Sequence, residues 1–167
     1  SITSSEEFWK EQANQLEWYN LPSNILSTDK NGYPLWFADG NLNACYLAVD
    51  KHIQDGYGEQ VAIIYDSPVT QTVKKYTFNE VKTEVAKLAG GLLSLGLEKG
   101  DTAIIYMPMI PQAAFAMLAC ARIGVTHSVV FGGFAPHELR IVFVNSSPKA
   151  FIPQFYGLKM NGLIPYN

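Results

Sequence analysis

The side chains best suited to chemistry in this sequence are three histidines, and their spacing does not form a site. His52, His127 and His137 are far apart in the chain, and none has a Cys, Asp or Glu partner at metal-ligand spacing. The pattern predicts no metal site, and we expect His127 to be a hydrogen-bonded histidine in a buried strand. The sequence contains no G-x-S-x-G motif, so it shows no hydrolase nucleophile.

Two pairs of glycines could approach a phosphate or a nucleotide. Gly90 and Gly91, in "GGLLSLGLEKGD", are not followed by G-K-[ST], and we expect them to allow close packing of a helix against a sheet. Gly132 and Gly133, in "VVFGGFAP", come directly after an apolar strand and before a predicted helix. Residues without Cβ let a ligand approach the backbone, and ligands bind at this edge of open α/β sheets. A tight turn without a ligand would need the same glycines, so both interpretations stay open.

The elements that position the second glycine pair alternate between strands and helices after Gly58. Thr77 and Glu80 form a capping box at the start of one helix, and Gly96 is suited to end it in the left-handed conformation. The predicted apolar stripe of this helix consists of Phe78, Val81, Val85, Leu88, Leu92 and Leu95. The other predicted elements are a hairpin over 60–66 and 73–78, buried strands over 102–107 and 125–131, a strand over 149–153, and helices over 111–124 and 135–144. This order predicts a layered α/β fold with a mostly parallel sheet flanked by helices.

Residues 1–58 differ in composition from the rest, and we expect two parts, 1–58 and 59–167. The first part is rich in aromatic and loop-forming residues, with a short helix expected near its start and a helix over 42–53. Trp9, Trp18 and Trp36 could mark a partner surface, but we expect them to pack a long loop onto the α/β body.

Composition excludes several classes of function. The 167 residues carry a net charge of −3 and no Lys/Arg run, which argues against a nucleic-acid surface. The longest apolar run is closed by Arg122 and is too short to span a bilayer. Cys45 and Cys120 have no C-x-x-C spacing, which indicates a reducing compartment, either the cytoplasm or the mitochondrial matrix.

Four stretches of the sequence resemble the AMP-forming acetyl- and propionyl-CoA synthetases of the acyl-adenylate-forming superfamily. They are "WFADGNLNACYLAVDKHI", "IIYDSPVT", "KGDTAIIYMPMIPQAAFAMLACARIGVTHSVVFGGFAPHEL" and "SSPKAFI". The resemblance runs from about Phe8 to Tyr166 and looks closer to the propionyl-CoA branch. It implies a ligase that activates propionate or acetate with Mg-ATP to an acyl-adenylate, then transfers the acyl group to CoA and releases AMP.

The resemblance also implies which residues of this chain contact a cofactor. In the family the "FGGF" turn lies beside the CoA nucleotide, which assigns Phe131, Gly132 and Gly133 to CoA binding. The family often has a basic residue for the CoA phosphate where this chain has Gly162, and Lys159 is a candidate substitute. A second departure is the run Val142–Val144, which stands where the family usually has Arg-Ile-Asp.

The family's phosphate loop, its adenine and ribose motifs and its late catalytic lysine have no counterpart in these residues. We therefore expect a partial domain of a larger enzyme, inactive alone and prone to self-association through exposed apolar surface. The alternatives are a stand-alone CoA- or nucleotide-binding module without catalysis and a flavodoxin-like or Rossmann domain. The absence of G-x-G-x-x-G after any strand argues against the Rossmann alternative.

Overall fold

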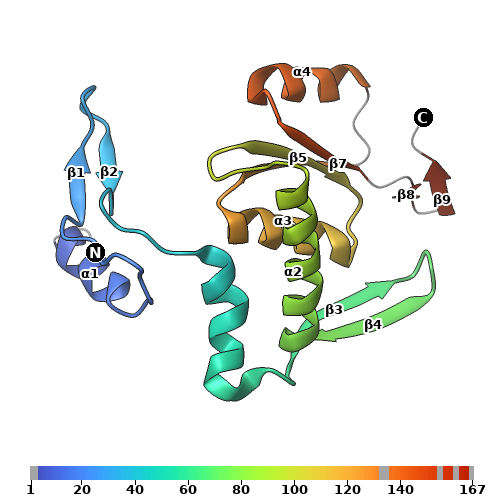
Figure 1. The fold of residues 1–167 in the computed structure, drawn as a ribbon, viewed down its shortest axis with the longest axis horizontal. Coiled ribbons are helices and arrows are strands. Elements are labelled where there is room, and N and C mark those ends of the chain that lie inside the picture. Colours follow the sequence, from blue (N-terminus) through green and yellow to red (C-terminus); the bar gives the residue numbers. More distant parts are fainter. Residues whose placement is uncertain (1–3, 132–135, 154–155, 160–161, 166–167) are drawn as a thin grey trace.

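The computed structural model describes residues 4–131, 136–153, 156–159 and 162–165 (Figure 1). Its N-terminal unit consists of helix α1 (Ser5–Ala13) and the antiparallel hairpin of β1 (Leu26–Thr28) and β2 (Pro34–Trp36). Aromatic rings join the helix to the hairpin, with the Trp9 and Trp36 ring centroids 6.0 Å apart. Figure 1 shows this unit set apart from the remaining elements. The tryptophans therefore pack within their own unit, and our expectation that they pack onto the α/β body was wrong.

The helix predicted over 42–53 is present, but much of it is π-helical. Two π-helical segments, η1 (Tyr46–Asp50) and η2 (Ile53–Tyr57), follow one another. A π turn brings residues five apart to the same side, so Asp50 lies with Cys45 and Val49 on the buried side. The sequence pattern indicated the apolar face but carried no signal for the wider turn.

Asp50 fastens this segment to the helices of the α/β body. Asp50 Oδ2 accepts a hydrogen bond from Arg122 Nη2 at 2.5 Å, and Asp50 Oδ1 lies 3.1 Å from Lys82 Nζ. Asn43 Nδ2 adds a hydrogen bond to the backbone oxygen of Arg122 at 2.9 Å. Burying the carboxylate is tolerated because both of its oxygens face cations.

The predicted hairpin and capped helix are confirmed. β3 (Val61–Ser67) pairs antiparallel with β4 (Thr72–Thr77), and α2 (Phe78–Ser94) follows at once. The Glu80 N–H donates to Thr77 Oγ1 at 3.2 Å, and the Thr77 N–H donates to Glu80 Oε2 at 2.8 Å. Gly96 ends the helix with φ +83°.

Two expectations about α2 were wrong. Leu95 is 75% exposed, and Ala89 is buried on the apolar face instead. Gly90 and Gly91 face solvent, and a Cβ on either would meet nothing within 4 Å. They therefore do not serve close packing against the sheet.

The centre of the molecule is a parallel sheet in the order β6-β5-β7. Its strands are β5 (Thr102–Met107), β6 (Thr126–Phe131) and β7 (Ala150–Pro153). α2 and α3 (Pro111–Ile123) pack on one face, and α4 (Pro136–Ser146) packs on the other (Figure 1). A last hairpin of β8 (Tyr156–Lys159) and β9 (Gly162–Pro165) follows β7. The predicted layered α/β fold is confirmed.

The core explains the apolar composition of β5 and α3. Ile104 and Ile105 on β5 are fully buried on opposite faces, and Phe115, Ala116 and Ala119 of α3 are buried against α2 and the sheet. α3 starts at Pro111 and ends at Gly124 with φ +75°, as predicted. No helix in the described part of the chain is both long enough and apolar enough to cross a membrane.

The run Val142–Val144 on α4 divides between the core and solvent. Val142 and Phe143 pack against the cluster of Ile104, Tyr106 and Val130, whereas Val144 is 69% exposed. Two of these three side chains therefore contribute to the apolar contact of α4 with the sheet.

Candidate functional site

The candidate site is the carboxyl edge of the parallel sheet, where all three strands end. Met107 at the end of β5 pairs with Phe131 at the end of β6, and Tyr106 pairs with Pro153 at the end of β7. The backbone of Phe131 therefore lies at the edge where ligands dock in open α/β sheets. Gly132 and Gly133 follow directly, and they and the Phe131 side chain lie outside the described residues.

The loop beside this position is apolar. Residues 107–111 read Met-Pro-Met-Ile-Pro and carry no titratable group. Met109 is 84% exposed, and the Ile110 N–H donates to the Pro108 oxygen at 2.8 Å, which tightens the entry into α3. An edge with this composition can hold a planar or apolar part of a ligand, but the loop supplies no acid or base for a proton transfer.

The second candidate, Lys159, ends β8 and stands directly opposite Gly162 in the terminal hairpin. The two positions considered for the phosphate contact are thus cross-strand partners. The side chain of Lys159 lies outside the described residues, so its distance from the Phe131 backbone edge stays a prediction.

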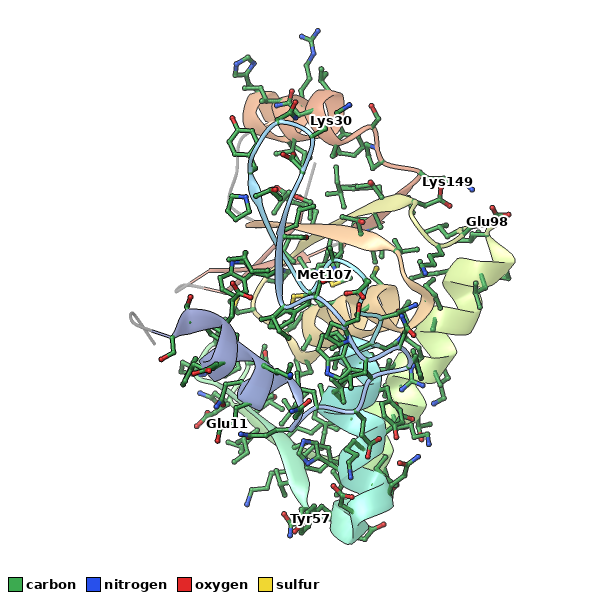
Figure 2. All side chains as sticks on the ribbon, turned by 90° about the vertical axis from the view of Figure 1, so that its left-hand side faces the viewer. Glu11, Lys30, Tyr57, Glu98, Met107 and Lys149 are labelled. Carbon is green, nitrogen blue, oxygen red and sulfur yellow. The ribbon has the colours of Figure 1, made fainter. Side chains whose placement is uncertain are left out.

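The opposite, amino edge of the sheet holds a charge pair. Lys149 Nζ lies 2.9 Å from Asp101 Oδ2, and the Lys149 N–H donates to the Thr102 oxygen at 2.8 Å. The Lys149 ammonium, together with the Glu98 N–H, holds the pKa of the Asp101 carboxyl below its ordinary value. In Figure 2 Lys149 lies near Glu98, and Met107 at the other edge lies apart from both. This pair joins the starts of β5 and β7 and is structural.

Other reactive side chains are buried or engaged. Cys45 and Cys120 are free thiols without solvent exposure, and burial raises the pKa of each. The His52 ring stacks on Phe78 with centroids 4.8 Å apart. His127 is only half-buried and makes no side-chain hydrogen bond in the part of the chain that the structure describes. Our expectation of a hydrogen-bonded histidine in a buried strand was therefore wrong. The described residues hold no group of three His, Cys, Asp or Glu side chains placed to bind a metal ion.

Sequence reasoning missed an open cleft of about 400 Å³ between β4 and the starts of α2 and α3. Its floor is the edge-to-face pair of Tyr76 and Phe115, whose centroids lie 5.3 Å apart. Lys74 lies over the Tyr76 ring, and Glu80 is engaged in the capping box. No spacing in the sequence signalled this cleft, because it joins a strand and a helix that lie about forty residues apart.

Comparison with known proteins gives consistent matches along the whole chain. Residues 1–48 match the family described as acetyl-coenzyme A synthetase N-terminus, and residues 51–161 match the family described as AMP-binding enzyme. An uncharacterized protein of Pseudomonas aeruginosa is 54% identical over 99% of this chain and 26% of its own length. Acyl-CoA synthetase short-chain family member 3, mitochondrial, from Bos taurus is 48% identical over 99% of this chain and 24% of its own length.

A third relative, the acetyl-coenzyme A synthetase of Pseudoalteromonas atlantica, is 41% identical over 99% of this chain and 26% of its own length. The chain thus spans about a quarter of the length of the curated relatives it matches. The AMP-binding match covers well over half of the residues, including the parallel sheet and the helices on both of its faces. The chain therefore belongs to the AMP-binding enzyme family, and its sequence corresponds to an N-terminal part of the short-chain acyl-CoA and acetyl-CoA synthetases.

Proposed function

We propose that this chain is the N-terminal part of a ligase that activates a short-chain carboxylate with Mg-ATP and transfers the acyl group to CoA. The observation that carries the proposal is the succession of the two family matches, over residues 1–48 and 51–161, in one chain. In such a reaction the carboxylate displaces pyrophosphate from ATP to form an acyl-adenylate. The CoA thiolate then attacks the acyl carbon, and AMP leaves.

Within this reaction we assign CoA binding to the turn after β6. Phe131 is the last residue of that strand, at the edge shared with Met107, and two residues without Cβ follow. The neighbouring loop 107–111 is apolar and carries no acid or base, which suits the binding of a coenzyme better than proton transfer. Lys159 is our candidate for the CoA phosphate, because an ammonium on the hairpin after β7 would follow the same edge of the sheet.

We propose propionate as the preferred acid, with acetate as the alternative. Support comes from the sequence, which resembles the propionyl-CoA branch more than the acetyl-CoA branch. The relatives named acetyl-coenzyme A synthetase are also less similar to this chain, at 40–41% identity, than those named acyl-CoA synthetase short-chain family member 3, at 45–48%. We also propose a reducing compartment, the cytoplasm or the mitochondrial matrix, because both thiols are free and buried.

The first test is the mass of the native polypeptide, detected with an antibody against this segment. We expect a product about four times heavier than the 18.5 kDa of this chain, because the chain covers 24–26% of its relatives. That product should form acyl-CoA from propionate, ATP and CoA, and the 167-residue chain should not. A native product of 18.5 kDa would contradict the ligase assignment.

The CoA assignment is tested separately in the longer protein with Gly133→Val, which adds a branched side chain to the turn. We expect the KM for CoA to rise about tenfold or more, with carboxylate-dependent exchange of pyrophosphate into ATP unchanged, since that half-reaction needs no CoA. Gly90→Ala, on the exposed face of α2, is the matched control and should change neither value. Equal losses in both half-reactions would place the turn outside the CoA site.

We further propose that the 167-residue chain, taken alone, self-associates. Large apolar side chains are exposed on several elements of the described structure, including Ile64, Val73, Leu95, Met109 and Val144. In the longer protein such side chains can be covered by the rest of the molecule, and exposed apolar surface favours association when that cover is missing. Light scattering over a concentration series measures it directly.

A further inference from the structure

An apolar cluster lies on the α4 face of the sheet, next to the carboxyl edge. Its buried members are Ile104 and Tyr106 of β5 and Val130 of β6, on the face opposite α2 and α3. Tyr106 pairs with Val130, and the following pair, Met107 with Phe131, is the last one before the strands end. The cluster therefore lies one residue away from the edge that forms the candidate site.

Helix α4 is held on this cluster by side chains at helical spacing (Figure 1). Leu139, Val142 and Phe143 are three and four residues apart, so they share one side of the helix, and all three pack against the cluster. The ring centroid of Phe143 lies 5.2 Å from that of Phe151 on β7, and Phe151 in turn stacks on Tyr106 at 6.1 Å. The contacts that hold α4 therefore reach all three strands.

The same cluster holds the chain on both sides of the glycine pair. Val130 is buried in it before the pair, and Leu139 packs against it after the pair. Only residues 131–138 separate these two positions, and Gly132 and Gly133 lie among them. A close-packed cluster answers a change in side-chain volume by shifting the elements that it joins. Its packing therefore sets the distance between the end of β6 and the start of α4.

We propose that Leu139 is a positioning residue for CoA, which acts through the turn by holding the first turn of α4 against the cluster. The inference rests on the assignment of CoA binding to Gly132 and Gly133 proposed above. It goes beyond that assignment because it makes the affinity for CoA depend on a side chain in the core beneath the turn. Adenylation of the carboxylate, which needs no CoA, is then independent of Leu139.

The test is Leu139→Ala in the longer protein. We expect the KM for CoA to rise about threefold to tenfold, because a small displacement of the binding backbone weakens the contacts with the coenzyme. Carboxylate-dependent exchange of pyrophosphate into ATP should be unchanged, which also shows that the rest of the enzyme is folded. Leu139→Met conserves the volume of the side chain and should return the KM to that of the unaltered protein.

The matched control is Leu92→Ala, which removes the same atoms from the other face of the sheet. Leu92 is buried near the end of α2, the end that leads to the start of β5 at the amino edge. We expect its midpoint of thermal unfolding to fall at least as far as that of Leu139→Ala, with the KM for CoA unchanged. An equal rise of this KM in both variants would reflect a general loss of stability and would overturn the proposal.

A double variant tests whether Leu139 acts through the turn. Since both changes alter one turn, Gly133→Val with Leu139→Ala should raise the KM for CoA by less than the product of the two single effects. A rise equal to that product would overturn the proposal. If Gly133→Val raises the KM and Leu139→Ala does not, the CoA assignment stands and the positioning role is wrong. If neither variant raises it, both are wrong.

Discussion

At the scale of single residues, the glycines of this chain differ in whether the fold requires the absence of a side chain. Gly124 ends α3 in the left-handed conformation, and a Cβ there would lie 2.8 Å from Lys99 Cγ. Gly90 and Gly91 sit inside α2 with open space over both. Of these three glycines, only Gly124 is therefore required by the fold.

The first prediction follows from this difference. Gly90→Ala and Gly91→Ala should each raise the free energy of unfolding by about 0.5–1 kcal/mol, because alanine lowers the entropy of the unfolded chain and fits the helix. Urea titration of the 167-residue chain measures the change. Gly124→Ala is the contrasting variant and should lower the free energy of unfolding, through its φ of +75° and the contact with Lys99. A loss of stability in Gly90→Ala would mean that the helix is covered there.

Residue-scale features were the most predictable from the sequence, and their exceptions share one cause. The Thr77–Glu80 box and the left-handed Gly96 depend on a few neighbouring residues, and both are confirmed. Leu95 and His127 depend on what lies across from them in space. Periodicity places Leu95 on the apolar stripe of α2, but it does not show that no other element packs on the stripe at its last turn. Leu95 is 75% exposed there.

At the scale of elements, the two edges of the parallel sheet are chemically opposite. The amino edge is closed by the pair of Asp101 and Lys149, and the carboxyl edge is bordered by the uncharged loop 107–111. The ion pair joins β5 to β7, which are separated by an entire helix–strand–helix segment. Because this pair requires a charged Asp101 carboxylate, its contribution to the free energy of unfolding should depend on pH.

The second prediction concerns acid unfolding. Because the folded-state pKa of Asp101 lies below its ordinary value, its stabilising contribution is present above about pH 4 and is lost as pH falls through the lowered pKa. Asp101→Asn should be less stable than the unaltered chain at pH 7 and should lose less stability between pH 5 and pH 3. Unfolding by urea at each pH measures this. Lys149→Met should behave similarly, and an unchanged acid slope in both variants would contradict the assignment.

The site could be predicted at this scale only in part. The order of strands and helices was sufficient to place Phe131 at the end of a parallel strand, because apolar runs and helix-end residues in the sequence indicate each element. The role in CoA binding came from resemblance, since a bare turn needs the same two glycines. The cleft floored by Tyr76 and Phe115 could not be foreseen, because only tertiary packing brings those rings together.

At the scale of the whole molecule, the N-terminal unit and the α/β body differ in how much they bury. Among the described residues before 45, only Ala13 and Pro22 are buried, whereas the body has a continuous core. All three tryptophans belong to the N-terminal unit, which the hydrogen bond from the Tyr46 hydroxyl to Glu17 Oε2, at 2.6 Å, helps to join to the body.

The third prediction is that unfolding of the chain is not a single transition. Tryptophan fluorescence should change at a lower urea concentration than the far-ultraviolet circular dichroism, because the fluorescence reports only the less buried unit. A Phe151→Trp variant, with a reporter on β7, should show an additional change that coincides with the dichroism. Coincident transitions for every probe would show instead that the two parts unfold together.

The position of β5 has a consequence for synthesis on the ribosome. β5 is the central and most buried strand, yet both of its partners, β6 (Thr126–Phe131) and β7 (Ala150–Pro153), come later in the chain. A nascent chain that has just released β5 therefore carries an apolar strand with no neighbour on either side until the next helix and strand have emerged. During that interval the capped helix α2 and its hairpin can already form from local contacts. They therefore offer the apolar surface against which β5 can pack before its partner strands have been synthesised.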